Sequence, residues 1–443
     1  MKSVMIFLCL IAIAVMSYGQ DSINIVRNQK WREDISYLKL RFPAYDKSIS
    51  PFLFFNTYSK TLEAFTVKDV TEHFYELADS IYNKVNEMGD EQIMLALSRL
   101  IALSPNAHSR LYLFRVRTVL NNIPVGIYWF GEELRIVSCP KDQPGILGAR
   151  ILEINGEPIK SMKRKISALI PGNASWKCYM STYFLRSPQV LKGLGLTSDG
   201  RRMQLKVMTI KNAILSTTLE ASFISQTKTQ EAWKDLSPIK INHDSLQHLL
   251  KENDKLPFYL QHPDRSFAYS ILKKEGILLL QINRNEAGSE LLSFNQFMVP
   301  IITIAKQQQV KKIVLDLRFN TGGDFSTTVG SITNLCKAIA GKKAYIIVSK
   351  ATFSAGIMSA ALFKKLTHAK VVGEAPGDEL VFLSEGGNLL LPNSRLNVHY
   401  ANGLQNWQFS ESFTLSPDIY VPFSFNAYLN EMDMALESII KDR

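Results

Sequence analysis

The chain has few cysteines, which limits the covalent and metal chemistry that can stabilise it. Only four occur among 443 residues. Cys9 lies in an apolar N-terminal stretch, which leaves Cys139, Cys178 and Cys336 for the folded part. Three cysteines cannot form a disulfide framework, and at most one bridge is possible. No group of His, Cys, Asp and Glu has metal-ligand spacing, so we expect neither a metal nor another cofactor.

Basic runs interleaved with aromatic residues are also lacking. The formal net charge is +11, from 51 Lys and Arg against 40 Asp and Glu, but the basic residues are scattered along the chain. Nucleic-acid-binding domains gather such residues in a patch or stripe, so a nucleic-acid partner is not expected. We interpret the charge as a solvated surface that attracts anionic envelopes or acidic substrates.

Long apolar runs are absent except at the N-terminus. The stretch MKSVMIFLCLIAIAVMSYGQ has an early Lys, an apolar segment from Val4 to Met16 and small or polar residues up to Gly19. This pattern predicts a secretory signal peptide over residues 1–19. A membrane anchor is the competing interpretation, but the run is shorter than the roughly 20 residues that span a bilayer. We therefore expect a soluble, exported protein in the periplasm or outside the cell, with no membrane span after cleavage.

The remaining chain is too long for one hydrophobic core, and its 46% hydrophobic and 21% charged residues are ordinary for globular domains. Helical periodicity comes first, as in VTEHFYELADSIYNKV and DEQIMLALSRLIAL. Strand patterns follow, then a polar irregular stretch, then alternating strands and helices that end in a helix over 426–440. We expect a helical cap over 20–110, a β-rich domain over 111–212, a connection or insertion over 213–265 and an α/β domain over 266–443.

The segment ATFSAGIMSAAL follows the buried-strand pattern AYIIVSK and places Ser354 where a helix should begin. The free N–H groups and the positive dipole end of a helix would stabilise an oxyanion formed there. Ser is also a preferred N-cap, so a simple helix cap is the competing interpretation. Upstream, KKIVLDLRFNTGG ends a second strand at Gly322 and Gly323. In a parallel sheet both turns would lie at the carboxyl ends of strands, where ligands bind, although the glycines also fit a plain tight turn.

A serine nucleophile needs a base, usually His, and a third group that holds the imidazole. Of the seven histidines, His108 differs because it follows SPNA after an amphipathic helix and precedes the strand-like run LYLF. This junction would bring a residue of the cap over the catalytic sheet. An ordinary loop histidine is the alternative. If a neutral His is the base, activity should fall below about pH 6.5, the reference value for histidine.

Several motifs occur in one order: NAHS, GARILEINGEPI, DLRFNTGG, TFSAG, VVGEAPGD and ESFTLSPDIYVP. In this order the chain resembles the C-terminal-processing, or tail-specific, serine peptidases over nearly its whole length. The resemblance implies a crotonase- or ClpP-like layered α/β core with an N-terminal helical cap. It also implies a PDZ-like β-rich domain that grips an extended or C-terminal peptide by strand addition. GARILEINGEPI is similar to part of such a domain, including its turn at Asn155 and Gly156.

The family has two catalytic styles. In the bacterial processing proteases a Lys within a Gly-Lys pair acts as base, but the corresponding stretch here is Gly377–Glu379 and contains no Lys. The tricorn-core branch uses an upstream His and a Glu six residues before a Pro-Asp-Ile segment, and Glu411 precedes Pro417 by 417 − 411 = 6 residues. The resemblance therefore makes Ser354 the nucleophile, His108 the base and Glu411 the supporting residue.

The same resemblance assigns the oxyanion hole to the N–H of Ala355 and that of Gly322 or Gly323. One departure from the tricorn pattern is Ala107. In that pattern a Ser directly precedes the base, so in this chain Ser104, Ser109 or water would orient His108. The leading hypothesis is thus an exported serine endopeptidase acting on polypeptides. The alternatives are an inactive peptide- or ligand-binding relative and, from the same layered architecture, acyl-CoA chemistry. Oligomeric state and substrate preference do not follow from the sequence.

Overall fold

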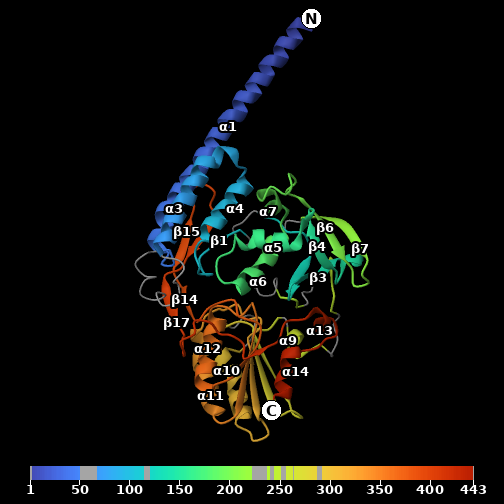
Figure 1. Cartoon of the computed structure of the whole chain (residues 1–443), viewed down its shortest axis with the longest axis vertical. Helices are drawn as coiled ribbons and strands as arrows, with labels where there is room; N and C mark the ends of the chain where they lie inside the picture. Colours follow the sequence, from blue (N-terminus) through green and yellow to red (C-terminus); the bar gives the residue numbers. More distant parts are fainter. Residues whose placement is uncertain are drawn as a thin grey trace.

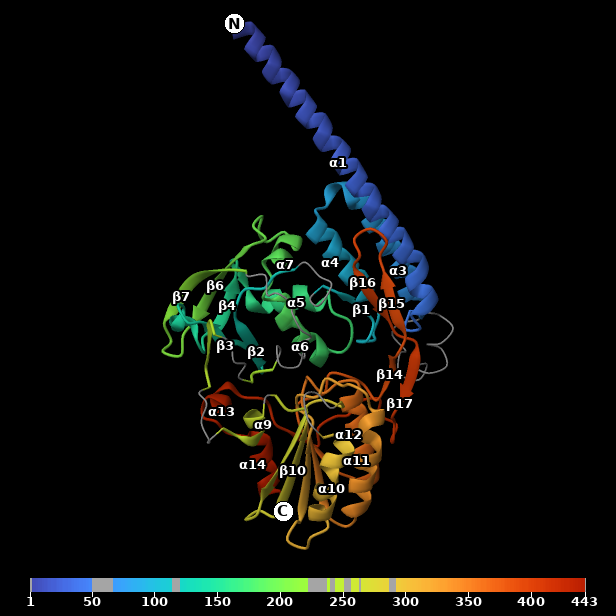
Figure 2. The same ribbon diagram turned by 180° about the vertical axis from the view of Figure 1, so that it is seen from behind.

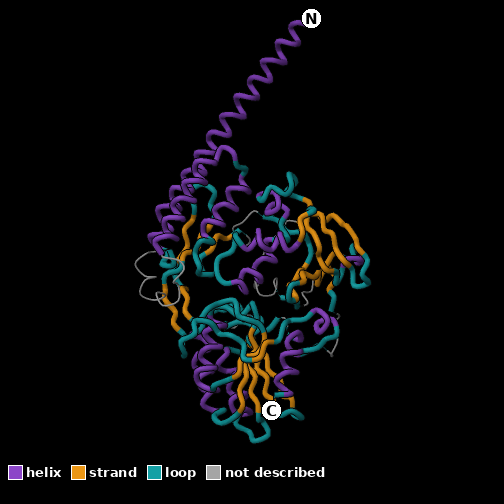
Figure 3. Tube along the Cα trace, in the orientation of Figure 1, coloured by secondary structure: helices purple, strands orange, loops and turns teal. Residues whose placement is uncertain are grey.

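The described part of the computed structural model comprises residues 2–49, 67–113, 120–221, 237–239, 244–250, 256–262, 264–286 and 292–442. Of the expected connection over 213–265, residues 222–236, 240–243, 251–255 and 263 lie outside the described residues. Helices lead the chain, a mainly antiparallel sheet follows, and a mainly parallel sheet with flanking helices ends it (Figures 1 and 3). The predicted mixed α/β class is confirmed.

The N-terminal helices pack on one another through apolar stripes. Phe74, Ala78 and Ile81 recur at intervals of four and three residues and are almost fully buried, which is the spacing of one helix face. The helices predicted from VTEHFYELADSIYNKV and DEQIMLALSRLIAL are confirmed. This region contains α1 (Lys2–Tyr45), α3 (Val67–Lys84), η1 (Val85–Glu87) and α4 (Asp90–Ile101).

The signal peptide was expected over residues 1–19, and this stays a prediction. Residues 2–19 form the first part of α1. Among the described residues, no helix combines the length and the hydropathy that a membrane crossing requires.

The middle sheet has the order β2-β3-β4-β6-β7, with β5 paired to β4 and β8 paired to β3. The turn between β4 and β5 is at Asn155 and Gly156, as predicted, and both have positive φ, 48° and 78°. Whether this sheet is a PDZ domain stays a prediction. Its strands are β2 (Gly126–Phe130), β3 (Glu133–Pro140), β4 (Arg150–Ile154), β5 (Glu157–Pro158), β6 (Arg202–Met208), β7 (Ile214–Glu220) and β8 (Leu246–His248). Its helices are η2 (Pro144–Ile146), α5 (Ile159–Ser167), α6 (Ala174–Phe184) and α7 (Pro188–Gly193).

Strands from the C-terminal part return to the N-terminal helices. β15 lies beside α1 and α3 (Figures 1 and 2), and the Asp34 carboxylate of α1 accepts hydrogen bonds from Asn393 N at 2.7 Å and Ser394 N at 2.8 Å. The short strand that follows His108 pairs with β16 rather than with the middle sheet. The segment carrying His108 is thereby fixed to the C-terminal region. These strands are β1 (Arg110–Tyr112), β14 (Val381–Ser384), β15 (Gly387–Leu390), β16 (Asn397–Tyr400) and β17 (Gly403–Asn406).

The C-terminal sheet has the order β18-β13-β12-β11-β10-β9, and every neighbouring pair except β10 with β9 is parallel. Leu278 and Leu280 of β10 face the core shared with α10, α11 and α12, and Leu279 faces the one shared with α14. Figure 2 shows the helices on the two faces. The strands are β9 (Phe267–Leu272), β10 (Ile277–Ile282), β11 (Lys312–Asp316), β12 (Lys343–Val348), β13 (Lys370–Gly373) and β18 (Ile419–Tyr420). The helices are α9 (Phe258–Gln261), α10 (Phe294–Ala305), α11 (Ser326–Ala338), α12 (Ala355–Thr367), α13 (Phe425–Leu429) and α14 (Met434–Lys441).

The single helix predicted over 426–440 is wrong, because α13 and α14 are separate. Asp433 caps α14 by accepting a hydrogen bond from Leu436 N at 3.1 Å. The Arg318 guanidinium also binds both oxygens of Asp433, at 3.0 and 2.8 Å. A continuous helix would remove Asp433 from the cap position and leave the buried Arg318 without this partner.

Candidate functional site

The turn between β12 and α12 holds Ser354 in a strained backbone conformation. Its φ is 54° and its ψ −124°, which a residue with a side chain rarely adopts and which costs about 1–3 kcal/mol. The Thr352 hydroxyl, which donates to Leu317 O at 2.9 Å, and the Phe353 N–H, which donates to Asn320 O at 2.9 Å, hold the turn against β11. The Ser354 side chain makes no capping hydrogen bond although it precedes α12. The plain N-cap interpretation is therefore excluded.

The glycine turn after β11 lies against the Ser354 turn. A Cβ on Gly322 would lie 2.8 Å from the Ser354 Cβ and 3.3 Å from Ala355 N, so only glycine permits this approach. The N–H of Gly322 donates to Asn320 Oδ1 at 2.8 Å. Within the described part of the chain, nothing accepts a hydrogen bond from the N–H of Gly323 or Ala355. Of the two glycines, Gly323 is therefore the one whose N–H is available to donate to an oxyanion.

His108 lies within a stack of aromatic rings and is buried, with 8% of its surface exposed. Its ring centroid is 4.5 Å from that of Phe353 and 5.2 Å from that of Phe382, both in stacked orientation. Trp176 in turn stacks on Phe353 at 3.8 Å. The imidazole is thus restricted in orientation by the residue next to Ser354.

A buried carboxylate fixes the loop that carries His108. Asp46, at the end of α1, accepts hydrogen bonds from the hydroxyls of Ser109 and Ser48, and the Ser48 hydroxyl lies 2.6 Å from that of Ser104. Burial raises the pKa of Asp46, and these hydrogen bonds oppose that rise. Ser104 and Ser109, which we expected to orient His108, therefore act on the loop through Asp46.

Asp378 connects His108 with Ser354. Its Oδ2 lies 3.2 Å from His108 Nε2 and accepts a hydrogen bond from Ser354 N, also at 3.2 Å. Its side chain is only 5% exposed. In the sequence this stretch served only to exclude a Lys base, and Asp378 was not predicted as a site residue. The available signal was an Asp at the place where the peptidases that the chain resembles carry that Lys.

The neighbouring Glu379 differs from Asp378 in its contacts. Burial raises the pKa of Glu379, the Asn173 amide lowers it and the charge of Asp378 raises it. Asn173, the N-cap of α6, reaches Glu379 Oε1 at 3.1 Å and Pro376 O at 3.2 Å. The loop after β13 is thereby tied to the middle region.

Glu411 is not brought together with the other site residues. It lies exposed in the loop between β17 and β18, and over the described residues it forms no hydrogen bond or ion pair with Ser354 or His108. The lysine closest before Ser354 in sequence, Lys350, is also directed elsewhere. Its Nζ donates to Trp129 O at 2.7 Å and lies 3.4 Å from Glu374 Oε2. The side chains that meet at Ser354 are therefore those of His108, Asp378 and the aromatic stack.

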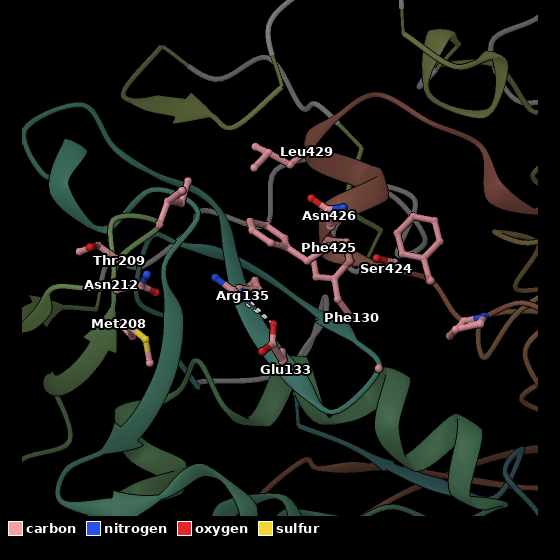
Figure 4. Close-up of a pocket in the computed structure, with 14 residues that line it drawn as sticks. Phe130, Glu133, Arg135, Met208, Thr209, Asn212, Ser424, Phe425, Asn426 and Leu429 are labelled. Carbon is pink, nitrogen blue, oxygen red and sulfur yellow. Dashed lines mark hydrogen bonds and ion pairs between the residues drawn. The ribbon is translucent and has the colours of Figure 1, made fainter.

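A cavity of about 530 Å³ lies elsewhere, between the β2–β3 and β6–β7 turns and the segment before α13 (Figure 4). Arg135 and Glu133 pair at its wall, and Phe425 lies under the Arg135 guanidinium at 4.2 Å. None of its lining residues belongs to the Ser354 site. In the described ranges, no group of three or more His, Cys, Asp and Glu side chains is arranged to hold a metal ion.

No family model matches the chain, and no curated protein matches its sequence. Solved structures do match. Mature CPAF is 11% identical over 93% of this chain and 96% of its own, with a TM-score of 0.61. Mature CPAF complexed with lactacystin is 12% identical over 93% of this chain and 97% of its own, with a TM-score of 0.60. The chain therefore has the fold of mature CPAF.

The matches also include the photosystem II D1 C-terminal processing protease, 12% identical over 91% of this chain and 96% of its own. Its TM-score of 0.37 is too low to support an argument about this chain. The resemblance that the motifs indicated is confirmed as a likeness of fold by the match to mature CPAF. The crotonase- or ClpP-like layering and the PDZ-like domain stay predictions.

Proposed function

We propose that this chain is an exported serine peptidase that hydrolyses polypeptides through an acyl-enzyme at Ser354. The observation that carries the proposal is the conformation of Ser354. Its backbone is strained, it precedes α12, and its hydroxyl makes no capping hydrogen bond to that helix. Strain of this kind persists where the surrounding structure enforces it, and it gathers at active sites. The predicted order of motifs and the CPAF fold support the same function.

In the proposed reaction Ser354 Oγ attacks the peptide carbonyl carbon and His108 takes the hydroxyl proton. The carbonyl oxygen becomes an oxyanion that accepts hydrogen bonds from the N–H groups of Ala355 and Gly323. As the C–N bond breaks, His108 gives its proton to the leaving amine, and the acyl group stays on Ser354. A water molecule, deprotonated by His108, then releases the acid and restores the serine.

Glu411 stays in the proposal as the residue that the family resemblance assigns to electrostatic support. The PDZ-like region over 111–212 is proposed to hold an extended peptide beside β2, the strand that ends the middle sheet. Part of this edge is already used, because Trp129 O accepts the hydrogen bond from Lys350. A peptide pairing there would compete with Lys350, four residues before Ser354.

An inactive peptide-binding relative is the second candidate. One observation favours it. Among the described residues, the His108 ring contacts Asp378 through a hydrogen bond and makes none with the Ser354 hydroxyl. In apo structures catalytic hydrogen bonds are often loose, so the first proposal remains the better supported one.

The two candidates separate in one experiment. The mature protein, its Ser354→Ala variant and a Ser270→Ala control on the edge strand β9 are each incubated with an unstructured peptide mixture. Mass spectrometry should find cleavage by the wild type and by Ser270→Ala but not by Ser354→Ala. Equal cleavage by all three would exclude Ser354 as the nucleophile, and binding without cleavage by the wild type would favour the inactive relative.

A further inference from the structure

The loop after β13 is built to hold one carboxylate in the site. Gly377 N donates to Thr352 O at 2.9 Å, and a Cβ on Gly377 would lie 2.6 Å from Lys350 O. Asn173 holds the same loop from the side of α6 through Pro376 O at 3.2 Å. The loop therefore lies on the Ser354 turn and on the middle region at once, and this places Asp378 between them.

Asp378 uses its two oxygens differently. Oδ1 accepts a hydrogen bond from Glu379 N at 3.1 Å, which fixes the carboxylate plane. Oδ2 is left for Ser354 N and for His108 Nε2, each at 3.2 Å. With 5% of its side chain exposed, Asp378 has little water to compete for these contacts.

We propose that Asp378 is the residue that positions His108, in the place that the family resemblance gives to Glu411. This inference rests on the proposed peptidase function. An ionised carboxylate only accepts hydrogen bonds, so the facing nitrogen carries the proton and His108 is the Nε2–H tautomer. Nδ1 is then the unprotonated nitrogen that takes the proton from Ser354 Oγ. The second contact of Oδ2 fixes the backbone of the same serine, so one carboxylate positions both the base and the nucleophile.

The other charged and titratable groups around His108 do not replace Asp378. Glu379 points to Asn173. From β16, His399 interacts electrostatically with His108 and with Arg110 of β1, and burial lowers the pKa of His399 to about 4. His399 is therefore neutral above that pH and supplies no counter-charge to an imidazolium at His108.

The decisive variant is Asp378→Asn. An amide oxygen at the position of Oδ2 can still accept from Ser354 N and from His108 Nε2–H, but the negative charge that faces an imidazolium at His108 is lost, and the NH₂ then opposes Glu379 N. Loss of the carboxylate that orients a catalytic histidine lowers kcat by up to about 10⁴. We expect a fall of about 10²–10⁴ in kcat with KM little changed. Glu379→Gln, the matched control, removes the adjacent charge and should change kcat by less than about tenfold.

The tautomer is read independently of activity from the ¹⁵N chemical shifts of the His108 ring. The wild type should show Nε2–H, and an Asp378→Ala variant, which removes the acceptor that faces Nε2, should lose this preference. An Nδ1–H wild type, or a folded Asp378→Asn variant within about tenfold of the wild-type kcat, would overturn the inference. If Asp378→Asn does not fold, the wild-type spectrum decides. A wild type that cleaves nothing refutes the proposed function, whereas its ring tautomer still tests Asp378.

Discussion

Replacing Gly322 by alanine places a methyl group directly against the nucleophile. The new Cβ would lie 2.8 Å from the Ser354 Cβ and 3.2 Å from its Oγ. The Gly322 backbone also has a φ of 109°, where L residues are strained. The contact and the strain act on the same turn, so the Ser354 turn or the glycine turn must shift.

The expected cost has two parts. Strain at positive φ destabilises the fold by about 1–2 kcal/mol. A shift of about 1 Å in a reacting group costs about 10² in rate, so we expect kcat/KM to fall at least a hundredfold. Denaturant unfolding measures the first part, and peptide hydrolysis or the labelling rate with a fluorophosphonate measures the second.

Gly330→Ala is the matched control because nothing lies within 4 Å of its added Cβ, which points into open space on α11. Alanine is favoured over glycine in a helix by about 0.5–1 kcal/mol, so this variant should be more stable and fully active. A Gly322→Ala protein with wild-type stability and labelling rate would refute the close approach of the two turns.

Three further results are expected. Arg318→Ala leaves the buried carboxylate of Asp433 unpaired at the start of α14, and chemical denaturation should show a loss of about 3–5 kcal/mol; a loss below 1 kcal/mol would contradict this. The native state holds the proton of Asp46 more tightly than the unfolded chain does, because burial raises that pKa. The stability of the wild type relative to Asp46→Asn should therefore be greatest below about pH 4 and fall as the pH rises through the raised pKa; pH-dependent denaturation showing a constant difference would exclude this. Glu411→Gln should lower kcat less than loss of the buried carboxylate beside His108 does, since Glu411 is exposed, and steady-state kinetics with the larger fall at Glu411 would restore the assignment from the family resemblance.

Local sequence was sufficient to predict the elements on which the site depends. The buried run before Ser354 and the glycines after β11 define two strand-turn-helix units, and the structure contains both. The turn at Asn155 was predictable for the same reason, because an Asn-Gly pair adopts positive φ by itself.

Contacts between distant segments were not predictable in this way. His108 and Asp378 are 270 residues apart, and no periodicity or motif in one chain reports such a pair. The pairing of β1 with β16 and the break between α13 and α14 have the same origin: in each, a long-range partner decides the local structure. Glu411, the predicted third site residue, was therefore assigned by resemblance alone.

If Ser354 is an activated nucleophile, a covalent adduct should form on its hydroxyl oxygen. The protein is treated with a fluorophosphonate, whose fluoride is displaced by an activated serine oxygen, and the adduct is mapped by peptide mass spectrometry. We expect one adduct, on the peptide that contains Ser354, and none on the Ser354→Ala variant. An adduct at another residue, or no adduct on the folded wild type, would contradict this expectation.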